Sequence, residues 1–247
     1  MPKEAWFQEW FNSPYYHLLY NHRDEEEAFT FINRLITHLQ PPISERMLDV
    51  ACGKGRHSRA LADMGFDVTG IDLSFDSIRE AKKSENEHLH FFQHDMRLPF
   101  WIQYFNYAFN FFTSFGYFRT RREHDNAIRT VAKSLITNGV FVMDYLNVSY
   151  EENNLEKNSK EIADGIEFKI AKWDDAEHFY KQIQLEEKGE IRNLVTEKVA
   201  KFTLKHFTEM FAKQELQIQE VYGDYKFKDY DIHKSPRLIM IAKRVRN

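Results

Sequence analysis

The sequence predicts an α/β protein with a mostly parallel sheet and helices on both faces of that sheet. From residue 46 onward, short apolar runs alternate with amphipathic stretches, as in successive β-α-β units. A glycine-rich turn follows the first of these runs, at residues 51–55. The chain has 247 residues, of which 43% are hydrophobic, so it can bury a sizeable core as one domain with an insertion.

Seven apolar runs and the helices between them define the expected sheet. Strands are predicted at residues 47–50, 66–72, 89–94, 107–112, 140–145, 216–222 and 238–243. Helices are predicted at residues 56–64, 74–85, 122–136 and 203–214, with Ser74 capping the second and Asn138-Gly139 closing the third. Parallel neighbours in this order need right-handed crossovers. Residues 46–159 and 203–247 are therefore assigned to one sheet domain.

The first 45 residues are expected to be helical, in two pieces. The first piece carries an apolar stripe formed by Trp6, Phe7, Trp10 and Phe11. A break follows at Asn12-Ser13-Pro14, and a second helix is expected from near Asp24, its predicted N-cap, to Pro41-Pro42. Residues 1–45 are therefore treated as a separate N-terminal helical segment.

Residues 160–202 interrupt the alternation of strands and helices. Apolar and polar residues alternate in three runs, which are separated by turns at Asp174-Asp175 and Lys188-Gly189. Alternation of this kind is typical of antiparallel strands with one solvated face. The segment is therefore predicted to be an antiparallel β meander inserted into the parallel sheet.

Composition and charge argue against several classes of protein. The formal net charge of −4 disfavours a nucleic-acid binder, whose surface is usually basic. No run of 18 apolar residues is present, and the first residues lack the apolar run of a signal peptide, so no membrane association is expected. The single cysteine, Cys52, excludes an intramolecular disulfide and fits a reducing compartment, so a cytoplasmic location is expected.

The turn between the first strand and its helix carries the strongest chemical signal. Small residues at Ala51, Gly53 and Gly55 allow the backbone to approach a ligand, and the following helix offers unpaired N–H groups. A dinucleotide fingerprint needs a third glycine where this sequence has Ser58. An acid at Asp49 also suits a ligand with an ammonium group better than a pyrophosphate.

This segment resembles motif I of class I S-adenosylmethionine-dependent methyltransferases, D/E-x-G/A-x-G-x-G. The matching residues are Asp49, Ala51, Gly53 and Gly55. The resemblance extends over roughly residues 15 to 245 and implies a Rossmann-like fold with a seven-stranded, mostly parallel sheet. It also implies S-adenosyl-L-methionine as the cofactor, with the amine of its methionine part near Asp49.

Further cofactor contacts are implied after the second, third and fourth strands. Asp72, 19 residues after Gly53, can accept hydrogen bonds from both ribose hydroxyls, and Leu73 belongs to the same strand end. The resemblance implies that Asp95 receives the adenine amino group and that Met96 packs near the ring. It places Phe112, in the segment 111–118, at the methyl-transfer cleft. Alternatively, Asp72 and Asp95 are helix N-caps.

The N-terminal segment resembles a region that covers the cofactor in many relatives, so residues 1–45 are interpreted as a lid. Tyr16 is hypothesised to contact the methionine carboxylate, and ordinary aromatic packing is the alternative. No catalytic residue is assigned, because methyl transfer depends mainly on alignment. If a base is used, the candidates are Tyr117, Tyr145 and His206.

Three further features have open interpretations. Arg237 is a candidate for binding an acidic substrate group, or it pairs with Asp224 or Asp229. The histidines of the third predicted strand are interpreted as exposed edge residues rather than as metal ligands, and no metal is expected; they are His88, His90 and His94. The insertion is expected to form a roof over the substrate cleft or a homodimer surface.

The function predicted from the sequence is S-adenosylmethionine-dependent methyl transfer to a small molecule. An RNA or protein methyltransferase is one alternative, although the acidic net charge disfavours a nucleic-acid substrate. A non-catalytic S-adenosylmethionine-binding protein is another. An NAD-dependent oxidoreductase is the most distant, because Ser58 replaces the third glycine.

Overall fold

A computed structural model describes residues 6–20, 25–187 and 190–245. Its main sheet has seven strands in the order β10-β11-β5-β4-β1-β2-β3. The strands are β1 (Arg46–Val50), β2 (Asp67–Asp72), β3 (Leu89–Gln93), β4 (Phe105–Asn110), β5 (Leu135–Leu146), β10 (Leu216–Tyr222) and β11 (Arg237–Arg244). Strands β1 to β5 pair in parallel, and β11 pairs antiparallel with both β5 and β10. The predicted seven-stranded, mostly parallel sheet is confirmed.

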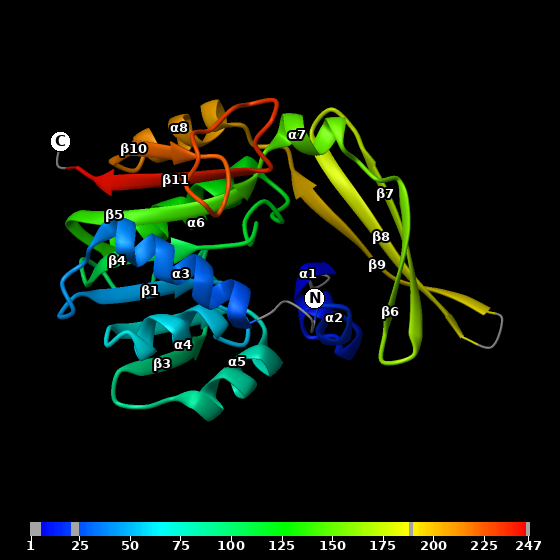
Figure 1. The fold of residues 1–247 in the computed structure, drawn as a ribbon, viewed down its shortest axis with the longest axis horizontal. Helices are drawn as coiled ribbons and strands as arrows, with labels where there is room; N and C mark the ends of the chain where they lie inside the picture. The colour runs from blue at the N-terminus through cyan, green and yellow to red at the C-terminus, as the bar shows by residue number, and fades with distance from the viewer. Residues whose placement is uncertain (1–5, 21–24, 188–189, 246–247) are drawn as a thin grey trace.

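Helices cover both faces of this sheet (Figure 1). Side chains of α3 (Glu25–Leu39), α4 (Arg56–Asp63) and α5 (Phe75–Ala81) pack on one face. Side chains of α6 (Arg121–Ser134) and α8 (Leu204–Ala212) pack on the other. Because the central strands are covered on both sides, β1 and β2 are buried along almost their whole length.

The helix α6 and strand β5 meet in a way that the sequence did not predict. The helix ends at Ser134, and Leu135 already has extended backbone and opens β5. Asn138-Gly139 therefore does not close the helix. It lies within an irregular part of β5, where Asn138 has a φ of 68° and the register with β4 shifts. The complete burial of Leu135 explains the early end of the helix, because this residue enters the sheet instead of continuing the turn.

The N-terminal segment contains three helices rather than two. Between α1 (Trp6–Phe11) and α3 lies a short helix, α2 (Pro14–Leu19). The hydroxyl of Ser13 accepts a hydrogen bond from the backbone N–H of Tyr15, and Pro14 occupies the first turn. The predicted break at residues 12–14 is thus the start of this extra helix. Asp24, the predicted N-cap of the next helix, lies outside the described residues.

A second sheet follows β5 and the helix α7 (Val148–Asn153). It contains four antiparallel strands in sequence order, β6 (Asn158–Ala163), β7 (Ile166–Asp174), β8 (His178–Glu187) and β9 (Glu190–Ala200). The prediction of an antiparallel insertion is confirmed, but it has one strand more than expected and forms a sheet of its own. The predicted turn at Lys188-Gly189 lies outside the described residues.

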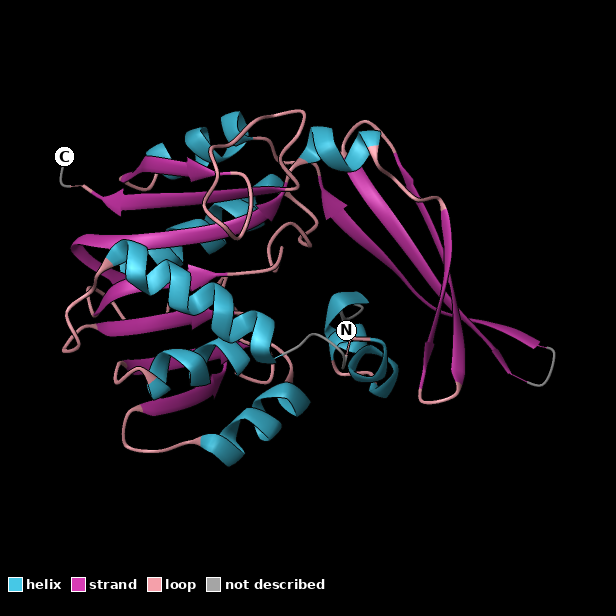
Figure 2. Ribbon diagram, in the orientation of Figure 1, coloured by secondary structure: helices cyan, strands magenta, loops and turns pink. Residues whose placement is uncertain are grey.

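Helices α1 and α2 lie between the two sheets (Figure 2). Trp10 and Leu19 of these helices share a small hydrophobic core with Phe168 and Ile183 of the second sheet. The short helices thus pack on the second sheet through a core that is separate from the two cores of the main sheet. The space beside them, at the carboxyl ends of the parallel strands, is where the cleft lies.

Candidate functional site

The carboxyl ends of β1 to β4 open into a cleft with two compartments. Both compartments have Tyr16, Tyr20, Ala51, Gly53 and Phe112 in their walls. The aromatic compartment is the one lined by Phe7, Phe11, Tyr117, Phe118, Asp72 and Glu197, among others. The basic compartment is the one lined by His17, Asp49, Lys54, Arg56, His57 and Arg59, among others. Open α/β sheets bind ligands at this edge.

Asp49, near the end of β1, places a buried carboxyl group in the wall of the basic compartment. Its Oδ2 accepts a 2.6 Å hydrogen bond from the hydroxyl of Ser58 on α4. Burial raises the pKa of Asp49 to about 6, although the bond from Ser58 opposes this shift. A cationic ligand group beside it would favour its ionised form.

Asp72, at the end of β2, is held by two backbone amides. Its Oδ2 accepts from the N–H of Gly53 at 2.9 Å, and its Oδ1 accepts from the N–H of Ser74 at 2.8 Å. Burial raises the pKa of Asp72, and these two bonds oppose the shift. The side-chain cap of α5 is Ser74 itself, which accepts from the N–H of Ser77. Each carboxylate oxygen of Asp72 has a further lone pair for a ligand hydroxyl.

The glycine-rich turn has three residues in the left-handed region, with φ of 60° at Ala51, 57° at Gly53 and 80° at Gly55. A Cβ added at Gly53 would meet no protein atom within 4 Å, and this residue lines both compartments. A Cβ added at Gly55 would lie 2.4 Å from the ring of Phe91. The absence of a side chain at Gly53 therefore leaves space for a ligand. At Gly55, which lines neither compartment, it leaves space for the buried ring of Phe91.

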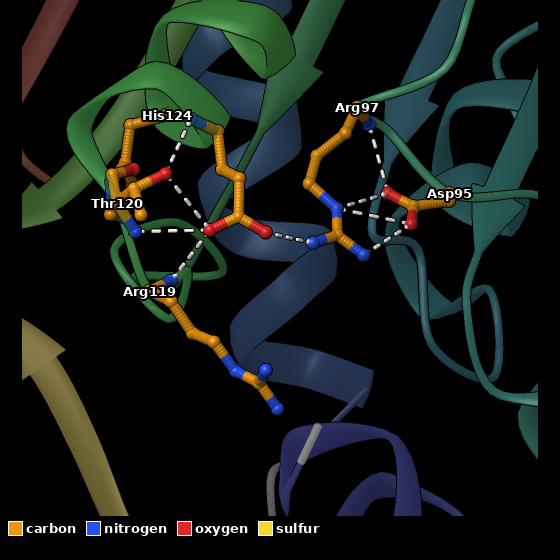
Figure 3. Close-up of polar contacts among 6 residues, drawn as sticks. Asp95, Arg97, Arg119, Thr120 and His124 are labelled. Carbon is orange, nitrogen blue, oxygen red and sulfur yellow. Dashed lines mark hydrogen bonds and ion pairs between the residues drawn. The ribbon is translucent and has the colours of Figure 1, made fainter. Parts of the chain in front are cut away.

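Asp95, after β3, is gripped by Arg97 (Figure 3). The Nε of Arg97 lies 3.0 Å from Oδ1 of Asp95, and a terminal guanidinium nitrogen lies 2.6 Å from Oδ2. The same guanidinium reaches Glu123 on α6 at 2.7 Å. Burial on its own would raise the pKa of Asp95, but the bonds from Arg97 outweigh it and lower the pKa. Asp95 is thus a fixed, ionised acceptor in the aromatic compartment.

The remaining predicted cofactor residues also lie at the cleft. Leu73 and Met96 line the aromatic compartment, and Phe112 and Tyr16 line both compartments. The ring of Tyr16 packs edge-to-face against Phe11, with centroids 5.1 Å apart. Of the ten residues predicted to bind the cofactor, Gly55 alone lines neither compartment.

The turn after β4 is held by Asp144, which the sequence analysis did not identify. Phe112 has a φ of 55°, and its N–H donates a 2.8 Å hydrogen bond to Oδ2 of Asp144. On the other side, Nε of Arg237 donates to Oδ1 of Asp144 at 2.8 Å, and Arg237 also donates to the hydroxyl of Thr113 at 2.8 Å. The carboxylate of Asp144 is fully buried, so this ion pair fixes the loop that carries Phe112.

The predicted ion-pair partners of Arg237 are therefore wrong. Its ion-pair partner is Asp144 on the neighbouring strand, not Asp224 or Asp229. It also lines neither compartment of the cleft, so it is not placed to bind a substrate group there. Residues 237 and 144 lie in adjacent strands near the cleft end of the sheet, and only the antiparallel register of β11 and β5 brings them together.

Only one of the three candidate bases lies at the cleft. Tyr117 lines the aromatic compartment. Tyr145 is fully buried, and its hydroxyl donates a 2.6 Å hydrogen bond to the carbonyl oxygen of Ala200. The Nδ1 of His206 accepts from the N–H of Thr203 at the start of α8. Tyr145 and His206 are thus structural residues, and their proposed catalytic roles are wrong.

The histidines in and beside β3 and the single cysteine have different surroundings. His94 lines the aromatic compartment, whereas His88 and His90 line neither compartment. Cys52 is buried in the turn, and burial raises the pKa of its thiol well above the usual range, so it stays protonated. Across residues 6–20, 25–187 and 190–245, no group of three or more His, Cys, Asp or Glu side chains is arranged to hold a metal ion.

An open α/β sheet, a glycine-rich turn before a helix and an acid ending the second strand together define a Rossmann-like fold. Residues 47–139 match the family model described as a methyltransferase domain.

Solved structures support the fold over nearly the whole chain. The CcbJ methyltransferase from Streptomyces caelestis is 16% identical and has a TM-score of 0.78, with 96% of this chain and 98% of that chain covered. An S-adenosylmethionine-dependent methyltransferase from Clostridium acetobutylicum ATCC 824 is 15% identical and has a TM-score of 0.76, with 94% and 96% covered. At these identities, the likeness establishes the fold.

Curated relatives match this chain over part of its length. The dTDP-3-amino-3,4,6-trideoxy-alpha-D-glucopyranose N,N-dimethyltransferase of Streptomyces venezuelae is 34% identical over 104 residues, which cover 42% of this chain and 43% of that protein. The first curated relatives are all matched over less than half of their length. Within the described residues, no helix is long and apolar enough to cross a membrane.

Proposed function

We propose that this protein transfers a methyl group from S-adenosyl-L-methionine to a small molecule. The observation that carries the proposal is the convergence of Asp49, Asp72 and Asp95 on one cleft around the turn at Gly53. These acids come from the ends of three neighbouring strands of the sheet or from the residues just after them. A ligand with an amine, a sugar diol and an exocyclic amino group would satisfy all three.

The residues present fit the cofactor. Asp49 has no ion-pair partner among the described residues and a pKa raised by burial, so a ligand ammonium group is the partner it lacks. Asp72 keeps lone pairs for the ribose hydroxyls beyond its bonds to Gly53 and Ser74. Asp95, ionised by Arg97, is a ready acceptor for the adenine amino group, with Met96 beside it.

The basic compartment suits the amino-acid end of the cofactor. Lys54, Arg56 and Arg59 line it together with Asp49, so groups of both signs face one space. A zwitterion needs this combination, because its carboxylate and its ammonium group are both charged at neutral pH. Tyr16 also lines this compartment, and its proposed bond to the methionine carboxylate stays part of the proposal.

When bound, the cofactor supplies an activated methyl group on a sulfonium centre. The chain then has to align the acceptor with that methyl group and exclude water, which in well-oriented reactions lowers the barrier by about 7–11 kcal/mol. Phe7, Phe11 and Phe118 line the aromatic compartment and present apolar surface for both purposes. Phe112, fixed by Asp144, lies between the two compartments.

A small acceptor is supported by the shape of the entrance. Residues 1–45 are proposed to act as a lid and residues 160–202 as a roof, because α1, α2 and β9 all contribute side chains to the aromatic compartment. A cleft covered from two sides admits a metabolite more readily than a folded RNA or protein. The named activity of the Streptomyces venezuelae relative is on a nucleotide-linked amino sugar, which is a small molecule.

Two finer points belong to the same proposal. The outer strand β6 exposes Ile162, and pairing of two copies through the second sheet remains the alternative role for residues 160–202. A cytoplasmic location is proposed from the single buried cysteine and the acidic net charge.

Calorimetry with S-adenosylmethionine and with NAD tests the cofactor directly. We expect S-adenosylmethionine to bind and NAD not to bind. Asp72→Asn should lower the affinity for S-adenosylmethionine by at least tenfold, because the variant loses charged hydrogen bonds to the ribose. Asp67→Asn, at the other end of β2, is the matched control and should bind normally. Equal affinity of the Asp72 variant and the parent would rule out the proposed site. A methyl-transfer assay over a metabolite panel then separates an enzyme from a passive binder.

A further inference from the structure

The charges in the cleft are divided between its two compartments. Among the described residues that line the aromatic compartment there are three carboxylates, on Asp72, Asp95 and Glu197, and no Lys or Arg. The cations Lys54, Arg56 and Arg59 line the basic compartment instead. The aromatic compartment is therefore suited to a cationic group, which would pair with one of these three carboxylates.

Two of the three acids are already engaged. Asp72 accepts from the backbone amides of Gly53 and Ser74, and Asp95 is held by the guanidinium of Arg97. In the proposed function, both serve the adenosine part of the cofactor. Glu197 on β9 is left, and it belongs to the second sheet rather than to the cofactor edge of the main sheet.

Glu197 is fixed through one oxygen and open at the other. Its Oε1 accepts from the indole Nε1 of Trp10 at 2.7 Å and from the hydroxyl of Tyr20 at 3.1 Å. Within the described part of the chain, Oε2 has no hydrogen bond. The side chain is half-buried and lines the aromatic compartment. A carboxylate that is oriented through one oxygen presents the other in a defined direction.

Lys181 is a cation on the strand next to Glu197. It lies opposite Glu197 in the register of β8 and β9, and its ammonium group donates to the hydroxyl of Tyr20 at 2.7 Å. It also lies 4.8 Å from the centre of the Tyr20 ring. No ion pair joins Lys181 to Glu197 in the described residues, and Lys181 does not line the aromatic compartment. Lys181 thus orients the hydroxyl of Tyr20, which donates a hydrogen bond to Glu197.

Aromatic rings surround the same space. Phe7, Phe11 and Tyr117 line the aromatic compartment, and the rings of Phe11 and Tyr117 meet at 90° with centroids 5.5 Å apart. The faces of aromatic rings attract cations, and more strongly when the cation is desolvated. Rings and a carboxylate together form a binding environment for an organic ammonium group.

We infer that the methyl acceptor is an amine and that its nitrogen binds at Oε2 of Glu197. This inference rests on the proposed function, because it concerns the acceptor side of the same cleft. The amine loses a proton to solvent, and its lone pair forms the new N–CH₃ bond while the S–CH₃ bond breaks and its electron pair goes to sulfur. The positive charge thereby moves from sulfur to nitrogen, and the methylated ammonium group loses a proton afterwards.

A carboxylate beside the acceptor favours nitrogen over the other acceptors. The charge that develops on an attacking amine is positive, so Glu197 stabilises the transition state more than the neutral nucleophile. An acceptor carboxylate or phenolate is itself an anion, and it would be repelled by Glu197, Asp72 and Asp95. The aromatic compartment offers such an anion no Lys or Arg among its described residues.

The test uses three probes that share a cyclohexyl ring, cyclohexylamine, cyclohexanol and cyclohexanecarboxylate, with the full chain saturated with S-adenosylhomocysteine. We expect the amine to bind at least tenfold more tightly than the alcohol, and the carboxylate most weakly. Glu197→Gln should remove this preference and leave the affinity for cyclohexanol unchanged. Glu197→Asp, which keeps the charge, should retain part of it and covers the case in which the glutamine variant does not fold.

The matched control is Glu186→Gln on β8, an exposed residue that pairs with Lys169 and does not line the cleft. It should keep the full preference for the amine. An alcohol or carboxylate that binds as tightly as the amine, or a preference unchanged in both Glu197 variants, would overturn the inference. Failure of S-adenosylhomocysteine to bind would instead contradict the proposed function, so the two failures are distinguishable.

Discussion

The indole Nε1 of Trp10 donates a 2.7 Å hydrogen bond to Oε1 of Glu197, although 187 positions separate the two residues in the chain. Trp10 belongs to α1 and is almost fully buried, and Glu197 belongs to β9 and lines the cleft. The bond therefore ties the N-terminal helices to the second sheet at the wall of the proposed acceptor site. The position of the N-terminal helices and the orientation of Glu197 therefore depend on each other.

Trp10→Phe removes this bond and keeps most of the buried ring. A hydrogen bond to a charged group contributes about 1.5–3 kcal/mol, so we expect the free energy of unfolding to fall by about this amount. Urea unfolding measures the change. Trp173→Phe is the matched control, because Trp173 is 41% exposed and stacks on Tyr180 at the surface of the second sheet. Equal effects of the two substitutions would contradict a specific role of the Trp10 bond.

The turn at Gly53 and Gly55 gives a prediction about two glycines that the motif treats alike. Gly55→Ala should lower the free energy of unfolding by more than about 1–3 kcal/mol, because its Cβ would clash with Phe91 as well as strain the backbone. The Cβ of Gly53→Ala would meet no protein atom within 4 Å, so its folding cost should be only the strain of a left-handed alanine, about 1–2 kcal/mol. Its effect should appear in calorimetry, as a loss of cofactor affinity of at least tenfold. Gly53→Ala with unchanged affinity would show that the cofactor does not approach this residue.

The difference between these glycines shows how far the sequence could define the site. The motif and its spacing identified the acids at 49, 72 and 95 and the edge of the sheet at which they gather, because parallel strands end together. The partner of each glycine could not be predicted. Phe91 comes from β3, and its contact with Gly55 depends on the packing of a helix and a strand that local sequence does not encode.

The missed residues share the same cause. Arg97, Asp144, Glu197 and Trp10 act through partners that are distant in the chain or on another element. Arg237 carried a visible signal, a charge near a strand end, but its partner was misassigned because the register of β11 with β5 was not known. The alternation of residues 160–202 predicted antiparallel strands, yet alternation does not specify which sheet a strand joins.

Asp49 makes both stability and cofactor affinity depend on pH. Its pKa of about 6 in the folded protein lies above the usual aspartate value of 3.8, so between these values the native protein holds a proton that the unfolded chain has lost. The stability of the cofactor-free protein should therefore fall as pH rises through this window. Affinity for S-adenosylmethionine should rise over the same range, by up to about tenfold per pH unit, because the ligand ammonium group pairs with the ionised carboxylate.

Asp49→Asn should abolish both dependences, since an amide does not titrate. Calorimetry between pH 5 and pH 7 measures the affinity, and urea unfolding at the same pH values measures the stability. Asp63→Asn, on the exposed side of α4, is the control and should behave like the parent. A variant at position 49 that still shows the parent's rise in affinity would place the titrating group elsewhere.

Arg97 is predicted to position Asp95 for the adenine amino group. Arg97→Lys keeps the charge but loses the bidentate hydrogen bonds from two guanidinium nitrogens to the carboxylate, so Asp95 should lose its fixed orientation. The parent should bind adenosine more tightly than inosine, which lacks the exocyclic amino group, and the variant should lose most of this preference. If Arg97 had only a structural role, the substitution would lower the affinities for adenosine and inosine equally. Arg121→Lys, which disturbs a surface pair with Asp125, is the matched control and should keep the preference for adenosine.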